Sequence, residues 1–277
     1  AEQTLAVLGA GAWDWLVVDH YALDRRFETP LRAVAKHVLA IDDLADRIHD
    51  CDVLLDQNFY YDQQRRYLGK VPVECQLLLG PSFALLRPEF KAMRKQLQVK
   101  TDGVHNILVF FGGVDAANRT DQVLDLLIDL NLSIQVNVVI GQQHPQKEKI
   151  EQKCLQYGFK CHVQTNQIAT LMAQADLAIG AGGTSVWERC SLGLPSVCIA
   201  TADNQIQQLH DMQLAGLVFS ATRHEEPLAF LVSFLKNLGS QSKLLQTQSQ
   251  KGMELVDGNG AVKVGIALNA KIGRAHV

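Results

Sequence analysis

The segment formed by residues 178–205 constrains the fold of this chain more than any other stretch. It starts within an apolar run, residues 176–179, which predicts a buried strand of a parallel sheet. Small residues follow at 180–183, and helical spacing begins at 184–185. A second apolar run, residues 196–200, predicts the next strand. A strand, a glycine turn, a helix and another strand in this order are typical of an α/β domain with a parallel sheet.

The glycine turn of this segment predicts a phosphate site. Gly182 and Gly183 let the backbone pass close to a ligand, and the hydroxyl groups of Thr184 and Ser185 can cap the following helix. The free N–H groups at a helix N-terminus favour negative charge. The alternative is an ordinary strand-to-helix connection that binds nothing, and spacing alone does not decide between the two interpretations.

Two polar residues near the turn indicate which other chemical groups the ligand carries besides the phosphate. Glu188 lies one turn into the predicted helix, so we expect its carboxylate to project near the same glycine turn. Because phosphate repels a carboxylate, we expect Glu188 to accept hydrogen bonds from sugar hydroxyls; the alternative is a solvated helix residue. Asn204 follows the second strand at its carboxyl end, where open α/β sheets bind ligands. Together these residues predict a nucleotide-sugar pocket.

The composition is that of a folded protein without a global charge bias. Of the 277 residues, 47% are hydrophobic and 20% charged, and 26 Lys and Arg against 29 Asp and Glu give a net charge of −3. This balance does not favour nucleic acid or an anionic membrane as a partner, and no apolar run is long enough to span a bilayer. The histidines and cysteines lack metal-ligand spacing. We therefore expect no metal, and a monomeric cytoplasmic protein with reduced thiols.

The first part of the chain repeats one pattern, a buried strand followed by polar residues. The predicted strands are residues 15–19, 37–41, 53–55 and 76–79. His20 and Tyr21 follow the first strand at its carboxyl end, where they are site candidates; a loop histidine and a packed aromatic ring are the alternatives. Arg87 is held extended by the proline that follows it, and it is either a site residue or half of a surface ion pair.

The same pattern restarts after a polar, charged stretch at residues 91–103, which we interpret as an interdomain connection. Gly113 follows the first strand of this second part and Asn166 the third, both at carboxyl ends. We therefore expect a first domain over residues 1–97 and a nucleotide-binding domain over residues 98–271. The predicted strands of the second part are residues 107–111, 134–140, 160–163, 176–179 and 196–200. The predicted helices are residues 25–36, 145–157, 168–175, 205–215 and 226–238.

The last six residues, 272–277, match the translation of a common sequencing-adapter string. We expect them to be a non-native tail and exclude them from the fold and the site. His276, which lies within this tail, is accordingly not treated as a ligand.

Several strings of the chain resemble one family of enzymes. VDHYALD, AIDDLADRIHDCDVLLDQN, LLLGPSFALLRPEF and the FGGVD turn, together with GAGGTSVWERCSLGLP and ADNQ, are similar to the UDP-2,4-diacetamido-2,4,6-trideoxy-β-L-altropyranose hydrolases of pseudaminic acid biosynthesis. That family is related to the peptidoglycan N-acetylglucosaminyltransferase. The resemblance covers nearly all of residues 13–265. It implies an α/β fold of GT-B type, with two Rossmann-like domains facing a cleft.

The resemblance also implies an activity and roles for individual residues. The family cleaves its UDP-sugar with water, releasing UDP and the free sugar, without a metal or an organic cofactor, on a route that serves flagellin glycosylation. Glu188 would take the ribose hydroxyls, Asn204 the diphosphate or the sugar, and Tyr21 would face the sugar. The residues that would hold the diphosphate are Gly113, Gly182, Gly183, Thr184 and Ser185. Asn166 and Arg87 complete the set of substrate-binding candidates.

One family motif is absent from this sequence. The family carries its catalytic base as the histidine of a GxGH pattern near the start of the first domain, and no GxGH occurs here. We therefore expect an incomplete first domain and impaired turnover, with His20 as the nearest candidate for a substitute base. Two other functions stay open: a UDP-amino-sugar glycosyltransferase of the same architecture, and a nucleotide-sugar-binding protein without chemistry.

Overall fold

The computed structural model describes residues 1–97 and 103–274 of the chain. Residues 98–102 of the expected connection and residues 275–277 of the expected tail lie outside the described residues. The chain forms two compact units, one made of Ala1–Leu85 with Asn259–Val277 and the other of Leu86–Gly258. Within the described residues, no helix is long and apolar enough to cross a membrane.

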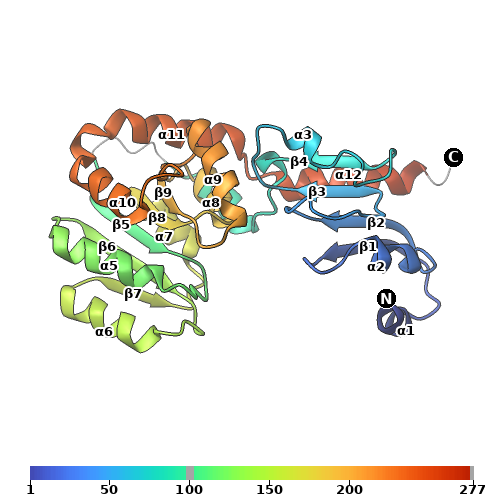
Figure 1. The fold of residues 1–277 in the computed structure, drawn as a ribbon, viewed down its shortest axis with the longest axis horizontal. Coiled ribbons are helices and arrows are strands. Elements are labelled where there is room, and N and C mark those ends of the chain that lie inside the picture. Colours follow the sequence, from blue (N-terminus) through green and yellow to red (C-terminus); the bar gives the residue numbers. More distant parts are fainter. Residues whose placement is uncertain (98–102, 275–277) are drawn as a thin grey trace. The chain divides into compact units, whose positions relative to one another are not determined.

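The first unit is built on a parallel sheet with the strand order β1-β2-β3-β4 (Figure 1). The strands are β1 Trp13–Asp19, β2 Ala35–Ile41, β3 Val53–Asp56 and β4 Gln76–Leu79. The helices are α1 Glu2–Leu8, α2 Arg25–Leu31, α3 Gln63–Arg66, the 3₁₀ turn η1 Pro81–Phe83, and α12 Gly260–Arg274. All four strands lie where the apolar runs of the sequence predict them.

Alternate side chains of the central strands pack on opposite faces of this sheet. Leu54 of β3 belongs to a cluster with Tyr67, whereas its neighbour Leu55 packs in a second cluster with Val264 and Ala267 of α12. A strand buried on both faces has no polar side to show, which is why its sequence is a continuous apolar run. The last helix of the chain therefore completes the core of the first unit.

The second unit carries a parallel sheet with the order β7-β6-β5-β8-β9 (Figure 1). The strands are β5 Asn106–Phe110, β6 Gln135–Ile140, β7 Lys160–Val163, β8 Leu177–Ala181 and β9 Ser196–Ile199. The helices are α4 Pro88–Arg94, α5 Arg119–Leu130, α6 Lys147–Tyr157, α7 Ile168–Gln174, α8 Ser185–Ser191, α9 Asn204–Leu214, α10 Pro227–Lys236, the 3₁₀ turn η2 Leu238–Ser240, and α11 Ser242–Leu255.

Helices cover both faces of this second sheet. One face packs with α5, α6, α10 and α11 around Ile107 and Val109 of β5. The other face packs with α4 and α7 around Leu108 of the same strand. The alternation of these three residues between two apolar clusters is the signature of a central strand in a doubly covered α/β sheet.

The observed division of the chain differs from the expected boundaries in two places. The expected connection, residues 91–103, begins inside a helix, because α4 extends from Pro88 to Arg94. Phe90 is fully buried, and Arg94 donates hydrogen bonds to the carbonyl groups of Ser191, Met253 and Val256. These contacts assign α4 to the second unit. At the other end, residues from 259 onward belong to the first unit, because α12 packs on its sheet.

Two helix predictions also need correction. The helix expected over residues 25–36 ends at Leu31, and the chain enters β2 at Ala35 after a short turn. Pro30 near the end of α2 removes a backbone donor, so the helix has little support beyond it. Helix α5 was not among the predicted helices, although its buried side chains Val123, Leu124 and Leu127 recur at helical spacing.

Candidate functional site

The strand order of the second sheet locates the place where a ligand can bind. The chain runs from the central strand β5 outward to β6 and β7, then returns to β8 on the other side and continues to β9. Open α/β sheets bind ligands outside the carboxyl ends of the strands where this reversal occurs. Here that point lies between β5 and β8. Gly113 follows β5 and Gly182 follows β8, so the sheet brings the two predicted glycine turns to one crevice.

Some glycines at this point are required by packing. A Cβ at Gly180 would overlap the carbonyl oxygen of Phe110 on the neighbouring strand, and a Cβ at Gly182 would come within 2.8 Å of Leu209. A Cβ on Gly141, after β6, would overlap the backbone of Gly113. These glycines therefore let neighbouring segments approach closely and are explained without a ligand.

Two glycines of the same turns face open space instead. Nothing lies within 4 Å of the position that a Cβ on Gly113 would take, and at Gly183 the nearest atom is Nε2 of Gln205 at 3.8 Å. Their backbone is accessible on the side where a side chain would otherwise stand. This opening next to bare backbone is what close approach of a diphosphate requires.

Glu188 projects from α8 beside the β8 turn, and its side chain is only 21% exposed. Burial raises the pKa of its carboxyl group, while the nearby cations Arg87 and Arg189 oppose this increase. Nη2 of Arg87 lies 3.7 Å from Oε1 of Glu188 and 3.1 Å from Oε1 of Glu89. The structure thus brings the predicted site residues Arg87 and Glu188 together within the second unit, as an ion pair. Arg87 is extended, as expected before a proline.

The start of α8 differs from the expectation at one point. Thr184 is the N-cap residue of this helix, but its side chain makes no capping hydrogen bond, and the helix is only seven residues long. Thr184 is exposed and Ser185 is partly buried. The hydroxyl of Thr184 is consequently open to solvent, and the short helix contributes less of a dipole than a long one would.

The two predicted asparagines lie far apart along the sheet. Asn204 is the exposed first residue of α9, which follows the edge strand β9, whereas Asn166 is exposed in the turn after the opposite edge strand β7. Gln205, next to Asn204, accepts hydrogen bonds from the backbone N–H and the hydroxyl of Thr201, and its Nε2 faces Gly183. Asn204 is therefore adjacent to the crevice, and Asn166 is separated from it by β6.

Asp115, the aspartate of the FGGVD turn, and His144, which the sequence analysis did not select, have structural roles after the carboxyl ends of β5 and β6. The carboxylate of Asp115 accepts hydrogen bonds from the N–H groups of Arg119 and Thr120 at 3.0 and 2.8 Å and so caps α5. His144 lies 3.5 Å from the same carboxylate and accepts a hydrogen bond from the N–H of Gln146. The signal in the sequence was an aspartate two residues after a glycine pair and shortly before a helix.

In the first unit, Tyr21 and His20 lie where β1 ends. Tyr21 is exposed, and its hydroxyl donates a hydrogen bond to Oδ2 of Asp43 at 3.5 Å; partial burial and this carboxylate raise its pKa. Nδ1 of His20 accepts a hydrogen bond from the N–H of Ala22 at 3.0 Å, so the neutral ring carries its proton on Nε2. In this geometry His20 presents a donor rather than a base.

Asp43 is a further polar residue at the carboxyl end of β2. Burial and the neighbouring Asp42 raise the pKa of its carboxyl group, and Asn58 donates a hydrogen bond to it at 3.1 Å. One of its oxygens, Oδ1, is buried without a hydrogen-bond partner. Tyr21, Asp43 and Asn58, which follow β1, β2 and β3, are thus connected by hydrogen bonds through the Asp43 carboxylate.

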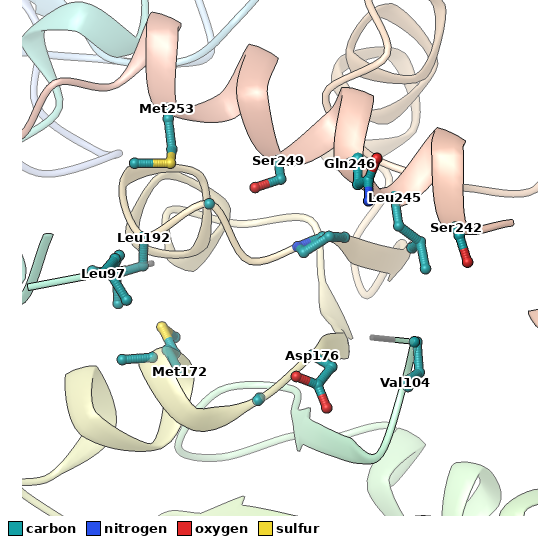
Figure 2. A pocket seen from close by; sticks show the side chains of 15 residues that line it. Leu97, Val104, Met172, Asp176, Leu192, Ser242, Leu245, Gln246, Ser249 and Met253 are labelled. Atoms are coloured by element: carbon teal, nitrogen blue, oxygen red, sulfur yellow. The ribbon is translucent and has the colours of Figure 1, made fainter. Parts of the chain in front are cut away.

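An apolar cavity of the second unit lies at the other edge of the sheet (Figure 2). Val104 and Asp176 come just before β5 and β8, and they line it together with Met172, Leu192 and Met253. The cavity therefore opens at the amino ends of the strands, away from the glycine turns. Its carboxylate, that of Asp176, accepts hydrogen bonds from the backbone N–H groups of His105 and Asn106 at 2.9 Å, so it holds the start of β5 in place.

Comparisons with known proteins identify a family model and several relatives. A family model described as the glycosyltransferase family 28 C-terminal domain matches residues 106–256. The spore coat polysaccharide biosynthesis protein SpsG of Bacillus subtilis is 32% identical over 193 residues, which are 67% of this chain and 56% of that protein. The UDP-2,4-diacetamido-2,4,6-trideoxy-β-L-altropyranose hydrolase of Campylobacter jejuni is 25% identical over 195 residues, which are 70% of this chain and 68% of that protein.

The fold is similar to solved structures as well. The crystal structure of Acinetobacter baumannii MurG matches with a TM-score of 0.63 and 15% identity, over 97% of this chain and 76% of that chain. The expected fold class, a GT-B-like α/β fold with parallel sheets, is confirmed. The chain spans just over half the length of the SpsG protein that it matches.

Proposed function

Because the chain belongs to the glycosyltransferase family 28 C-terminal domain family, whose members act as transferases or hydrolases, we propose that it is an enzyme that binds a UDP-sugar through its second unit. One observation carries the proposal: the two glycine turns after β5 and β8 expose open backbone at the reversal of strand order, with the carboxylate of Glu188 beside them. The open N–H groups suit the diphosphate, and the carboxylate suits the ribose hydroxyls.

The site residues divide by chemistry. Backbone at Gly113, Gly182 and Gly183, with the hydroxyls of Thr184 and Ser185, would hold the diphosphate. Glu188 would take the ribose hydroxyls. Asn204 would contact the diphosphate or the sugar. Arg87, which pairs with Glu188, would turn toward a phosphate when the ligand binds. Asn166 is proposed only as a contact at the far side of the rim, because β6 separates it from the crevice.

A thermodynamic cycle tests the ribose assignment. Glu188→Ala should weaken UDP binding by about 1.5–3 kcal/mol, since it removes hydrogen bonds to a charged group. 2′-Deoxy-UDP should bind the parent protein more weakly than UDP does, and Glu188→Ala should lose much of this difference. Calorimetric titration measures all four affinities. If the parent and the variant distinguish the two ligands equally, Glu188 does not contact the 2′-hydroxyl.

We favour hydrolysis of the anomeric bond as the reaction, with UDP and the free sugar as products. The relative from Campylobacter jejuni that is named as such a hydrolase supports this choice, as do the first-unit strings quoted above. In this reaction water attacks the anomeric carbon, and the charge of the departing UDP is stabilised by donors aimed at the phosphate. His20 and Tyr21 are the proposed residues on the sugar side.

Transfer of an amino sugar to an acceptor is the second candidate reaction. At the level of the fold, the family match and the similarity to MurG support transfer as much as hydrolysis. Product analysis separates the two reactions: a hydrolase forms free sugar and UDP without an acceptor, whereas a transferase forms a glycoside only when an acceptor is supplied. Binding of UDP-sugars with neither product would indicate a nucleotide-sugar-binding protein.

A further inference from the structure

Arg189 is a buried arginine next to the glycine turn, and its surroundings differ from those of most buried charges. Only 2% of the surface of Arg189 is exposed. Nη2 donates to the carbonyl oxygen of Ala181 at 2.7 Å, Nε donates to that of Ser185 at 3.2 Å, and Cys198 provides a sulfur contact at 3.7 Å. Within the described residues, no carboxylate forms an ion pair with it. Buried charges are normally paired, because an uncompensated charge in the interior is costly.

The position of the guanidinium group links it to the candidate crevice. A Cβ on Gly180 would come within 2.9 Å of Nη1 and would also overlap the carbonyl of Phe110, so the group lies against β8 where that strand adjoins β5. The two carbonyls that it holds belong to Ala181 and Ser185, which flank the open turn on both sides. Arg189 therefore links the two ends of the turn through hydrogen bonds to their carbonyl groups.

Holding the Ala181 carbonyl also fixes the direction of a donor. The C=O and N–H of a trans peptide point in opposite directions. With its carbonyl turned toward the guanidinium, the peptide between Ala181 and Gly182 directs its N–H away from Arg189. The positive charge also acts on neighbouring groups, since it opposes the increase in the pKa of the Glu188 carboxyl group.

From these contacts we infer that Arg189 is the positioning residue of the diphosphate site: it holds the turn in place, and its buried charge, which forms no ion pair among the described residues, attracts the bound diphosphate across that turn. The inference rests on the proposed function. The charge acts across the turn without touching the ligand, and at an effective dielectric constant of about 20 and roughly 10 Å it changes the affinity for a phosphate charge on the order of tenfold.

The test compares two ligands on three proteins. UDP and uridine share the nucleoside but differ in the diphosphate. Calorimetry on the parent, Arg189→Met and Arg189→Lys should show that the methionine variant loses about tenfold in affinity for UDP and keeps its affinity for uridine. Arg189→Lys keeps the charge and should lose less of its UDP affinity. Equal losses for both ligands, or no loss for UDP in Arg189→Met, would overturn the inference.

A measurement on the parent alone covers the case in which a variant does not fold. A buried charge is screened little by salt, whereas exposed lysines are screened strongly. The preference of the parent for UDP over uridine should therefore change little as the salt concentration rises, and a preference that disappears with salt would contradict the inference. A parent that binds neither ligand overturns the proposed function and the inference together. A parent that binds both, with no loss of UDP affinity in Arg189→Met, overturns the inference alone.

Discussion

At the scale of single residues, the candidate site depends on how charge is distributed around Glu188. Burial alone would hold the proton on this carboxyl group to a higher pH, and the cations Arg87 and Arg189 act in the opposite direction. Arg87 is half exposed, whereas Arg189 is buried. Only Arg87 can therefore be exchanged without disturbing the core. Its removal offers a direct way to alter the protonation of Glu188.

The first prediction concerns the pH dependence of uridine binding. The pKa of Glu188 is raised by burial, so the carboxylate that accepts the ribose hydroxyls is lost at a higher pH than for an exposed glutamate. Uridine affinity should be constant near neutral pH and fall as the pH decreases through this raised pKa. Arg87→Gln removes an opposing cation and should move the decline to higher pH.

Calorimetric titration at a series of pH values checks this prediction, with Arg65→Gln as the control. Arg65 is an exposed arginine of the first unit and should leave the profile unchanged. A profile that is the same in the parent and in Glu188→Gln would mean that Glu188 does not control binding.

Sequence reasoning placed most of the candidate residues after the carboxyl ends of the strands, but it could not rank them. Gly182 and Gly183 are adjacent residues of the same type. Leu209 occupies the space that a side chain at Gly182 would need, whereas the corresponding space at Gly183 is open. Arg189 is not distinguished by the sequence, because its burial depends on its contacts with Ala181 of β8 and Cys198 of β9. Such differences arise from tertiary packing, which spacing does not encode.

At the scale of elements, burial explains some of the predictions that matched the structure. The strands β4 and β7 have the predicted bounds. Burial explains this for β4, where an apolar run ends in two buried leucines, but not for β7, whose residues Lys160–Val163 are exposed or only partly buried. Residues 91–94 belong to the polar, charged stretch that predicts a connection, but they form the last part of α4. Its assignment to the second unit depends on Phe90 and Arg94, whose partners are distant in the sequence. The return of α12 to the first unit was unpredictable for the same reason.

The second prediction concerns the start of α12. A Cβ on Gly260 would overlap the backbone of Ala84 and Phe83, which cannot move as a flexible side chain would. Gly260→Ala should therefore destabilise the first unit by about 1–3 kcal/mol, the usual range for overpacking. Chemical denaturation followed by a probe in the first unit measures this loss.

Gly265 in the same helix provides the matched control. Nothing lies within 4 Å of the position that its Cβ would take. Gly265→Ala should be neutral or stabilise the helix by up to about 1 kcal/mol, because alanine has the higher helix propensity. Equal effects of the two substitutions would show that α12 does not pack closely on the segment that includes η1.

At the scale of the whole molecule, each unit has its own parallel sheet and its own apolar core. The family match lies entirely within residues 106–256, inside the second unit. The α/β class and the expectation of two successive βα parts followed from the alternation of strands and helices, whereas the Rossmann-like, GT-B type was implied by the resemblance to a known family. The account assigns nucleotide recognition to the second unit, so a bound nucleotide should stabilise that unit in particular.

Hydrogen exchange across the whole chain, with and without saturating UDP, tests this central claim most directly. At a UDP concentration of about 100 Kd the second unit gains about 2.7 kcal/mol, which slows exchange on the order of 100-fold for amides that exchange through its unfolding. The account predicts the clearest slowing in peptides that cover residues 110–115 and 180–189, with the strands β2 and β3 of the first unit changed least. Slowing confined to the first unit, or its absence from residues 180–189 when UDP is bound, would contradict the account.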